Sequence, residues 1–141
     1  MLATTALQTP DGDRLVEELR VGDLVYTHTL EPRKVLAVRQ RPYKGKLVNL
    51  NTGKVAEAVS VSATQPVLLY DAAYEKKKHL LWCYAMEAHE QAFHDGERLR
   101  RITVADEDAD DDVEMIDMWA IEVEKDRTVR TASGLVLYAG G

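Results

Sequence analysis

The chain has 141 residues, 45% of them apolar, which is enough for one ordinary folded domain with a real core. Its formal net charge of -6 argues against nucleic acid as a main partner. No run approaches the roughly 20 apolar residues that a membrane helix needs, and no signal peptide is visible. We therefore expect a soluble, intracellular protein that does not insert into membranes and needs no cofactor.

Most of the chain has the pattern of short β-strands that are separated by turn signals. Alternating or β-rich runs predict the strands, while the triplets Pro-Asp-Gly, Glu-Pro-Arg and Asn-Thr-Gly predict turns between them. Many short strands at this spacing favour a barrel or sandwich over alternating β-α units. The expected strands cover 6–9, 24–29, 34–40, 46–51, 56–63, 67–70, 99–104, 115–123 and 135–138.

Two stretches are helix-like instead. Residues 15–19 place apolar side chains at positions i, i+1 and i+4, which predicts a short helical turn. Residues 74–93 are rich in Ala, Glu, Lys and His, and fit either one longer helix or a strand plus a helix. A weak internal repeat is also visible, because residues 82–99 follow the same order of helical turn, glycine turn and strand as residues 14–24.

The opening of the chain carries an ordered pattern of residues. Residues 5–12 read T-x-L-x-T-x-D-G, a helical turn follows, and residues 21–25 read Val-Gly-Asp-Leu-Val. This combination resembles the opening block of inteins and of hedgehog autoprocessing domains, which together form the Hint superfamily. Three later blocks resemble the same family in the right order: 59–68 its T-x-x-H strand, 119–123 its Y-D-L-x-V strand and 132–139 its closing segment.

The resemblance implies an all-β fold. In this family the strands form a twisted β-horseshoe with pseudo-two-fold halves, and the chain has room for one or two short helices. The whole of 1–141 is then expected to be a single Hint-like domain, in which 105–114 is an acidic loop. Family members that carry a homing endonuclease insert it at that loop, and this chain has no such insert.

The first half of the family's catalytic machinery is missing from this chain. Autoprocessing needs a Cys or Ser whose side chain attacks the preceding peptide bond, and that position falls at Met1 or one place before it. Thr4 and Thr5 are close in sequence but stand in the wrong register. The T-x-x-H positions hold Ser62 and Gln65, and Gln65 cannot titrate, so it cannot donate a proton to the leaving nitrogen.

The second half of that machinery is missing as well. Inteins place an Asp in the late strand, where this chain has Ala120, and end on a His-Asn pair, where it has Tyr138 and Ala139. The carboxylate of the hedgehog branch aligns with Arg39, which has the opposite charge. Sites of this kind lose many orders of magnitude in rate when several members are removed together.

The resemblance and the vacant positions lead to one main hypothesis about function. We expect a catalytically inactive Hint domain that serves as a structural or protein-interaction module, in a larger assembly. The alternative is an autoprocessing domain, for splicing or self-cleavage, in a divergent or inactivated form. A small-ligand-binding barrel is a third reading, but no constellation of polar residues supports it.

A protein partner is expected to meet the aromatic-rich part of the chain between residues 74 and 101. Trp and Tyr are favoured anchors of protein interfaces, and a short basic run lies beside them. The same side chains fit the interior equally well if they cap the core of the barrel. The candidates are Tyr74, Lys76, Lys77, Lys78, Trp82, Tyr84 and Phe93.

No metal site is expected. Asp106, Asp108 and Asp110 match the first three ligand positions of a calcium loop, but Asp111 stands where that loop requires glycine, so a solvated acidic loop is the simpler reading. His89 and His94 lie five residues apart, which is not the helical spacing of a metal-binding pair. The single cysteine, Cys83, excludes an internal disulfide and is expected to pack as a small hydrophobic residue.

Overall fold

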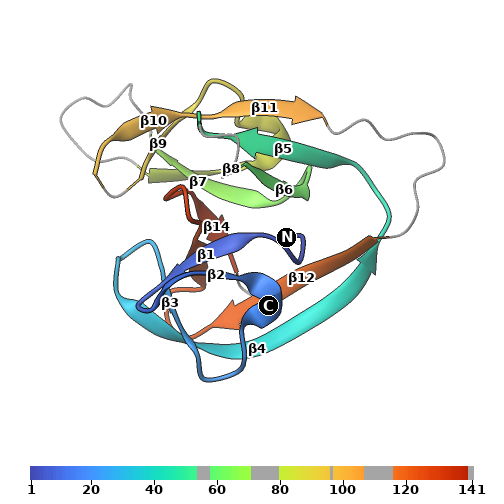
Figure 1. Ribbon diagram of the computed structural model, residues 1–141. Coiled ribbons are helices and arrows are strands. Elements are labelled where there is room, and N and C mark those ends of the chain that lie inside the picture. The colour runs from blue at the N-terminus through green and yellow to red at the C-terminus, as the bar shows by residue number, and fades with distance from the viewer. Residues whose placement is uncertain (54–57, 71–79, 96, 107–115, 140–141) are drawn as a thin grey trace.

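The computed structural model describes residues 1–53, 58–70, 80–95, 97–106 and 116–139. Strands dominate this part of the chain, and Figure 1 shows them in two groups, with β14 between the groups. The strands of the first half are β1 (Ala6–Thr9), β2 (Gly12–Leu15), β3 (Leu24–Tyr26), β4 (Pro32–Tyr43), β5 (Leu47–Asn51), β6 (Val59–Ser62) and β7 (Pro66–Tyr70). Those of the second half are β8 (Leu80–Tyr84), β9 (Ala92–His94), β10 (Leu99–Arg101), β11 (Thr103–Asp106), β12 (Ile116–Val123), β13 (Thr128–Arg130) and β14 (Val136–Tyr138).

The lower group in Figure 1 contains the β1–β2 hairpin and a three-stranded sheet of order β12-β4-β3. The hairpin closes at Gly12, whose φ of 101° is a left-handed conformation that glycine adopts without strain. β4 is 12 residues long and pairs antiparallel with β12 from Tyr43 to Val35. This long curved ladder connects the lower group to the upper one.

The upper group contains a three-stranded sheet of order β11-β5-β6 and the strands β10, β9 and β7 of a larger sheet, whose order β10-β9-β7-β14-β13 continues through β14 out of this group. Strand β8 pairs with β7 outside this path, on the edge of β7 that β14 does not use. The inward faces of both groups share one hydrophobic core, to which nearly every strand contributes. Its largest fully buried side chains are Phe93, Leu7, Leu19, Leu50, Ile102, Leu135 and Leu137.

The two halves repeat one backbone plan. Each contains a short 3-10 helix, η1 (Val16–Glu18) or η3 (Ala85–Glu87), and the residue before each helix has nearly the same extended conformation. The backbone hydrogen bonds repeat as well: Val16 N donates to Thr5 O over 2.9 Å, and Ala85 N donates to Gln65 O over 2.9 Å. The all-β horseshoe with pseudo-two-fold halves and few helices, which the sequence predicts, is therefore confirmed.

The turn after each 3-10 helix shows the same equivalence. Gly22 N donates to Val35 O over 2.8 Å, and Glu90 N donates to Ile102 O over 2.8 Å. Both turn residues have positive φ, 94° at Gly22 and 61° at Glu90. The first half thus uses glycine at this position, whereas the second half holds a residue with a Cβ in the left-handed region, which costs free energy.

Several predicted elements need correction. The described part of 74–93 contains no long helix; it forms β8, η3 and β9, which is closer to the alternative of a strand plus a helix. The predicted strand 24–29 ends at Tyr26, because Thr27 and Thr29 direct their hydroxyls to Asp126 Oδ2 instead of continuing the ladder. Strand 99–104 divides into β10 and β11, and the strands β2, β8, β9 and β13 were not predicted individually.

Arg130 connects the halves from inside. Its side chain is buried, and its guanidinium donates to the carbonyl oxygens of Thr27, His28 and Gly134 at 2.9–3.3 Å and of His94 at 3.5 Å. Burial lowers the pKa of Arg130, and the nearby carboxylate of Asp95 opposes that shift. The charge is therefore held mainly by backbone dipoles from both halves.

Replacing Glu90 by glycine should stabilise the fold. The substitution relieves the strain of the left-handed conformation, but glycine also raises the conformational entropy of the unfolded chain. We therefore expect a net gain of about 0.5–1 kcal/mol in the free energy of unfolding. Urea denaturation measures this gain. The matched control is Gly22→Ala at the equivalent turn, which should lose about 1 kcal/mol or more. An unchanged or lower stability in Glu90→Gly would show that the positive φ is not a source of strain.

Replacing Arg130 by methionine should leave four carbonyl groups without their donor and cost about 3 kcal/mol or more of stability. The matched control is Arg127→Met in the same segment, because Arg127 is exposed, and its effect should stay within about 0.5 kcal/mol. Thermal unfolding followed by circular dichroism compares the two variants. Equal melting temperatures would contradict the structural role of Arg130.

Candidate functional site

Met1, which the family resemblance places at the nucleophile position or next to it, is built into the fold. Its amino group donates to Trp119 O over 3.0 Å, and Trp119 N donates back to Met1 O over 2.6 Å. Met1 is therefore paired with β12, and its side chain is 7% exposed within the core. In Figure 1 the N-terminus lies between the upper and lower groups of strands. Burial lowers the pKa of the Met1 amino group from 8.0 to about 6.

The positions of the T-x-x-H block lie at the turn between β6 and β7. Ser62 ends β6 and is half-buried, and Gln65 N donates to Ser62 O over 3.0 Å to close the turn. Gln65 Nε2 donates to Tyr138 O over 3.0 Å and to Pro66 O over 3.1 Å. The structure thus brings together two of the predicted positions, Gln65 and Tyr138, through a neutral amide that links the turn to β14.

Arg39 and Ala120 are also brought together. They lie directly opposite each other in the β4–β12 ladder, and both are exposed. Arg39 Nη2 forms an ion pair with Glu122 Oε2 over 3.4 Å, on the neighbouring same-face position of β12. Arg39 is therefore occupied with a surface ion pair of small energetic weight.

The end of the described chain is held by backbone contacts. Ala139 is buried and donates its N–H to Arg127 O over 2.8 Å. Tyr138 is 39% exposed, and its ring lies 5.8 Å from the ring of Trp82 at 83°, an edge-to-face contact. The side chains at these two positions carry a phenol and a methyl group, so neither can cyclise as a terminal Asn does.

The candidate partner-binding residues separate into three groups. Tyr74, Lys76, Lys77 and Lys78 lie outside the described residues. Trp82 and Tyr84 are 46% and 49% exposed and remain available at the surface. Phe93 is a correction: it is 1% exposed, because it is the middle residue of β9 and points into the core, so it cannot contribute to a docking surface.

Cys83 is only half-buried, although the sequence predicts a buried hydrophobic role for it. Its Sγ donates to Tyr84 O over 3.1 Å. Burial and the nearby Glu87 carboxylate both raise the pKa of its thiol.

Most of the acidic run lies outside the described residues, and only Asp106 belongs to β11. Among the residues that the structure describes, no three His, Cys, Asp or Glu side chains converge as metal ligands, and no helix could cross a membrane.

One polar centre that the sequence did not reveal surrounds Asp126. Its Oδ2 accepts from Thr27 Oγ1 at 2.5 Å, Thr29 Oγ1 at 2.8 Å and Arg33 Nε at 3.1 Å. Burial raises the pKa of Asp126, but these donors outweigh it and hold the value at about 2. No local pattern signals this cluster, since Asp126 lies more than 90 residues from each of its three donors. It fixes the β3–β4 turn and has a structural role.

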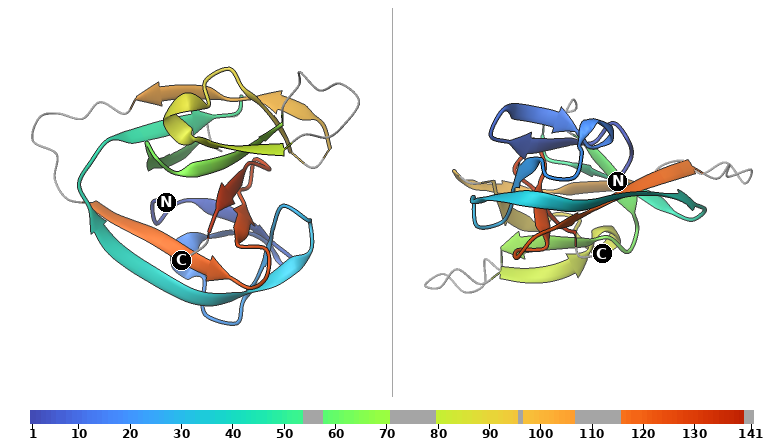
Figure 2. Two further views of the ribbon diagram at one scale, coloured as in Figure 1. Left: turned by 180° about the vertical axis from the view of Figure 1, so that it is seen from behind. Right: turned by 90° about the horizontal axis from the view of Figure 1, so that it is seen from below.

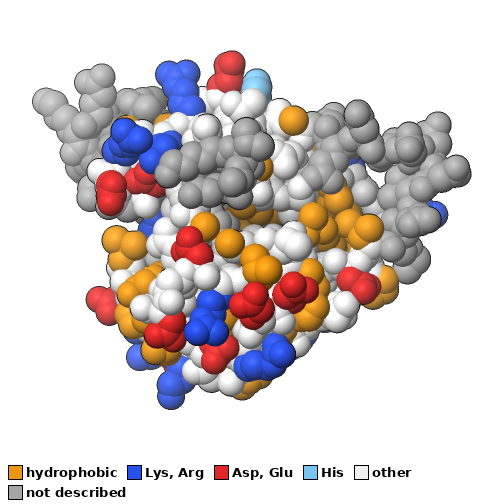
Figure 3. All heavy atoms as spheres, viewed as in Figure 1, with side chains coloured by type: hydrophobic (Ala, Val, Ile, Leu, Met, Phe, Trp, Pro, Cys, Tyr) orange, Lys and Arg blue, Asp and Glu red, His pale blue; other side chains and the backbone are white. Residues whose placement is uncertain are grey.

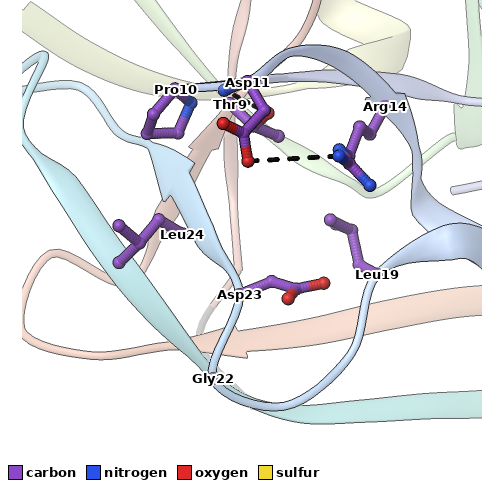
Figure 4. Close-up of a pocket in the computed structure, with 8 residues that line it drawn as sticks. All are labelled: Thr9, Pro10, Asp11, Arg14, Leu19, Gly22, Asp23 and Leu24. Carbon is purple, nitrogen blue, oxygen red and sulfur yellow. Dashed lines mark hydrogen bonds and ion pairs between the residues drawn. The ribbon is translucent and has the colours of Figure 1, made fainter.

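A shallow pocket of about 310 Å³ opens between the two turns of the opening block (Figure 4). Asp11 and Arg14 lie 4.0 Å apart on one side, and Asp23 Oδ2 on the other side accepts from Arg20 N over 2.8 Å. The pocket contains none of the predicted site positions. On the face seen in Figure 3, acidic and basic side chains are interspersed over the lower half of the molecule, without a field of one sign.

The fold is that of intein splicing domains. The chain superposes on the solution structure of a bacterial intein-like domain from Clostridium thermocellum with a TM-score of 0.74 and 18% identity, over 98% of this chain and 99% of that one. A DnaB intein from Synechocystis sp. PCC 6803 gives a TM-score of 0.72 and 12% identity over 100% and 98%. The gp41-1 intein gives 0.71 and 15% over 97% and 95%.

The opening block is similar at the level of sequence as well. The family model of the Hint domain matches residues 1–68. An iron-sulfur cluster assembly SufBD family protein of Mycobacterium tuberculosis is 41% identical over 63 residues, which are 44% of this chain and 7% of that protein. The chain therefore spans only a small part of the curated relatives it matches. The fold is thus that of intein splicing domains, and the opening block, residues 1–68, matches the model of the Hint domain.

The buried amino group of Met1 should make stability depend on pH. Its folded-state pKa of about 6 lies below the unfolded value of 8.0, so the unfolded chain binds more protons between these two values. The free energy of unfolding should fall by about 2 kcal/mol as the pH falls from 8.5 to 5.5. Urea titrations of the free and the Nα-acetylated chain isolate this contribution, because acetylation removes the titrating amine. Identical pH profiles of the two forms would contradict it.

Proposed function

We propose that this Hint domain does not cleave or splice and serves as a structural or protein-interaction module. The observation that carries the proposal is the set of residues at the catalytic positions of the family. By the family resemblance, Met1 stands at the nucleophile position or next to it, and Gln65 and Ala139 stand at the positions of the general acid and the cyclising amide. None of these three side chains can perform the corresponding step.

The surroundings of these positions support the same reading. The Gln65 amide donates to two backbone carbonyls, and Met1 is packed in the core, so both side chains contribute contacts that hold the strands together. The similar stretch in the SufBD family proteins is 7% of their length. We infer from this that the domain acts as one part of a larger assembly, with a protein as its partner.

A divergent autoprocessing domain is the second candidate, and one observation favours it. The backbone hydrogen bonds between Met1 and Trp119 form in both directions, so the start of the chain is held in place against β12 although its side chain is not a nucleophile. The deciding feature is the residue that precedes Met1 in the gene. A Cys or Ser there supports autoprocessing, whereas a precursor that starts at Met1 excludes this form of it.

The proposal is tested by the intact mass of the domain expressed between two inert flanking proteins. We expect the mass of the uncut fusion before and after addition of thiol and hydroxylamine, while a splicing-competent intein in the same fusion releases fragments. Released fragments from this chain would overturn the proposal. Substitution of Thr4, Thr5 and Cys83 by alanine would then identify the nucleophile.

A further inference from the structure

The turn between β12 and β13 is strained. Lys125 and Arg127 have φ of 59° and 53°, in the left-handed region that a residue with a Cβ enters only at a cost in free energy. The loop between β3 and β4 contains a third such residue, Leu30, with φ of 62°. Three of the four residues other than glycine that have positive φ in the described chain thus lie in these two segments. Strain of this kind persists only where the surrounding structure fixes the backbone, so both segments must be held by their neighbours.

Asp126 is the contact that holds both segments. It lies at the centre of the strained turn, and its Oδ2 accepts hydrogen bonds from Thr27, Thr29 and Arg33, which belong to the loop and to the start of β4. Its side chain is 13% exposed, so water competes little for these bonds. In the left view of Figure 2, the end of β12, in orange, lies beside the light-blue loop that joins β3 to β4. One carboxylate therefore connects the two places where the backbone is strained.

The side chains of the strained turn do not explain its conformation. Lys125 and Arg127 are exposed, so packing in the core does not require a Cβ at either position. Glycine adopts positive φ without this cost, and the fold has glycine in other turns, at Gly12 and Gly22. The strained turn is therefore stabilised from outside itself, through Asp126.

The strained turn also holds the end of the last described strand. Arg127 O accepts from Ala139 N over 2.8 Å, and Ala139 is buried. The next residue, Thr128, is 1% exposed, and its Oγ1 accepts from His28 N over 3.1 Å. A change of φ at Arg127 would rotate the backbone that follows it relative to β12 and to the β3–β4 loop. Both hydrogen bonds therefore depend on the strained conformation.

We propose that the Asp126 carboxylate is a latch, which keeps the strained turn closed and prevents a second, relaxed arrangement in which the amides of Ala139 and His28 lose their acceptors. The strained residues favour opening and the hydrogen bonds to Asp126 favour closure, at costs and gains of comparable size per residue and per bond. An element held between two such opposed terms is one that a local change can switch. Opening frees the end of β14, where Tyr138 packs on Trp82.

The latch goes beyond the proposed function and does not rest on it. Intact mass measures cleavage of the fusion, whereas hydrogen exchange measures opening of the turn. Each claim can therefore fail while the other stands.

Hydrogen exchange of the backbone amides, followed by NMR on the full chain, tests the latch. We expect Asp126→Ala to expose the amides of Ala139 and His28 together, so that both exchange at rates near those of an unstructured chain. The amides of Val16 and Ile102, which belong to other parts of the fold, should stay protected. Ala139 and His28 amides that remain as protected as these two would overturn the proposal.

A second set of variants tests the strain. In the Asp126→Ala chain, Lys125→Gly/Arg127→Gly should slow exchange at Ala139 by about fivefold or more relative to Lys125→Ala/Arg127→Ala. Both pairs remove the exposed side chains, but only glycine relieves the left-handed strain. Equal exchange in the glycine and alanine variants would show that the turn stores no strain, and would also overturn the latch.

A milder variant covers the case in which Asp126→Ala does not fold. Thr29→Val removes one of the three donors at an exposed position. It should speed exchange at Ala139 and His28 by about threefold or more, in the same ratio at both amides, since one opening event exposes both. Exchange at the rates of the unsubstituted chain would contradict the latch.

Discussion

The arrangement of the two halves depends on a buried cation that is solvated by backbone. The guanidinium of Arg130 donates hydrogen bonds to the carbonyl oxygens of Thr27 and His28 in the first half and of His94 in the second. The carbonyl oxygen of Gly134 is its fourth acceptor. A guanidinium that loses water must find acceptors, so it fixes the positions of every segment that supplies one. Gly134 also allows close packing, because a Cβ at this position would clash with the backbone of Asp95.

The parts of the fold that could be predicted are those with local causes. The Asp-Gly turn of the first hairpin, the strands of alternating pattern and the helical turn at 16–18 all follow from residues that are neighbours in sequence. The order of these blocks was enough to predict the Hint fold. The repeated plan was visible only weakly, because the two halves share backbone hydrogen bonds and not residue types: Gly22 and Glu90 occupy one conformation.

The parts that could not be predicted have non-local causes. Arg130 is bound by carbonyls, which every residue carries, so no side-chain pattern signals its site. Asp126 accepts hydrogen bonds from residues 27–33, more than 90 residues earlier in the chain, and Phe93 could be assigned to the core only once β9 was placed. Residues 74–93 were ambiguous because an aromatic edge strand that is exposed on one face carries neither the alternation of a half-buried strand nor the period of a helix.

Two residues at the catalytic positions predicted from the family resemblance make contacts with distant parts of the chain. Tyr138 stands where the family resemblance places a histidine, and its ring packs edge to face on Trp82 of the edge strand. Gln65 stands where the family resemblance places the general acid, and its amide donates to the carbonyl oxygen of Tyr138. A side chain that donates to a fixed backbone carbonyl, or that packs on a neighbouring ring, stabilises one arrangement of strands and needs no change of protonation. Gln65 and Tyr138 therefore contribute to the arrangement of β7, β14 and the aromatic pair of Trp82 and Tyr138.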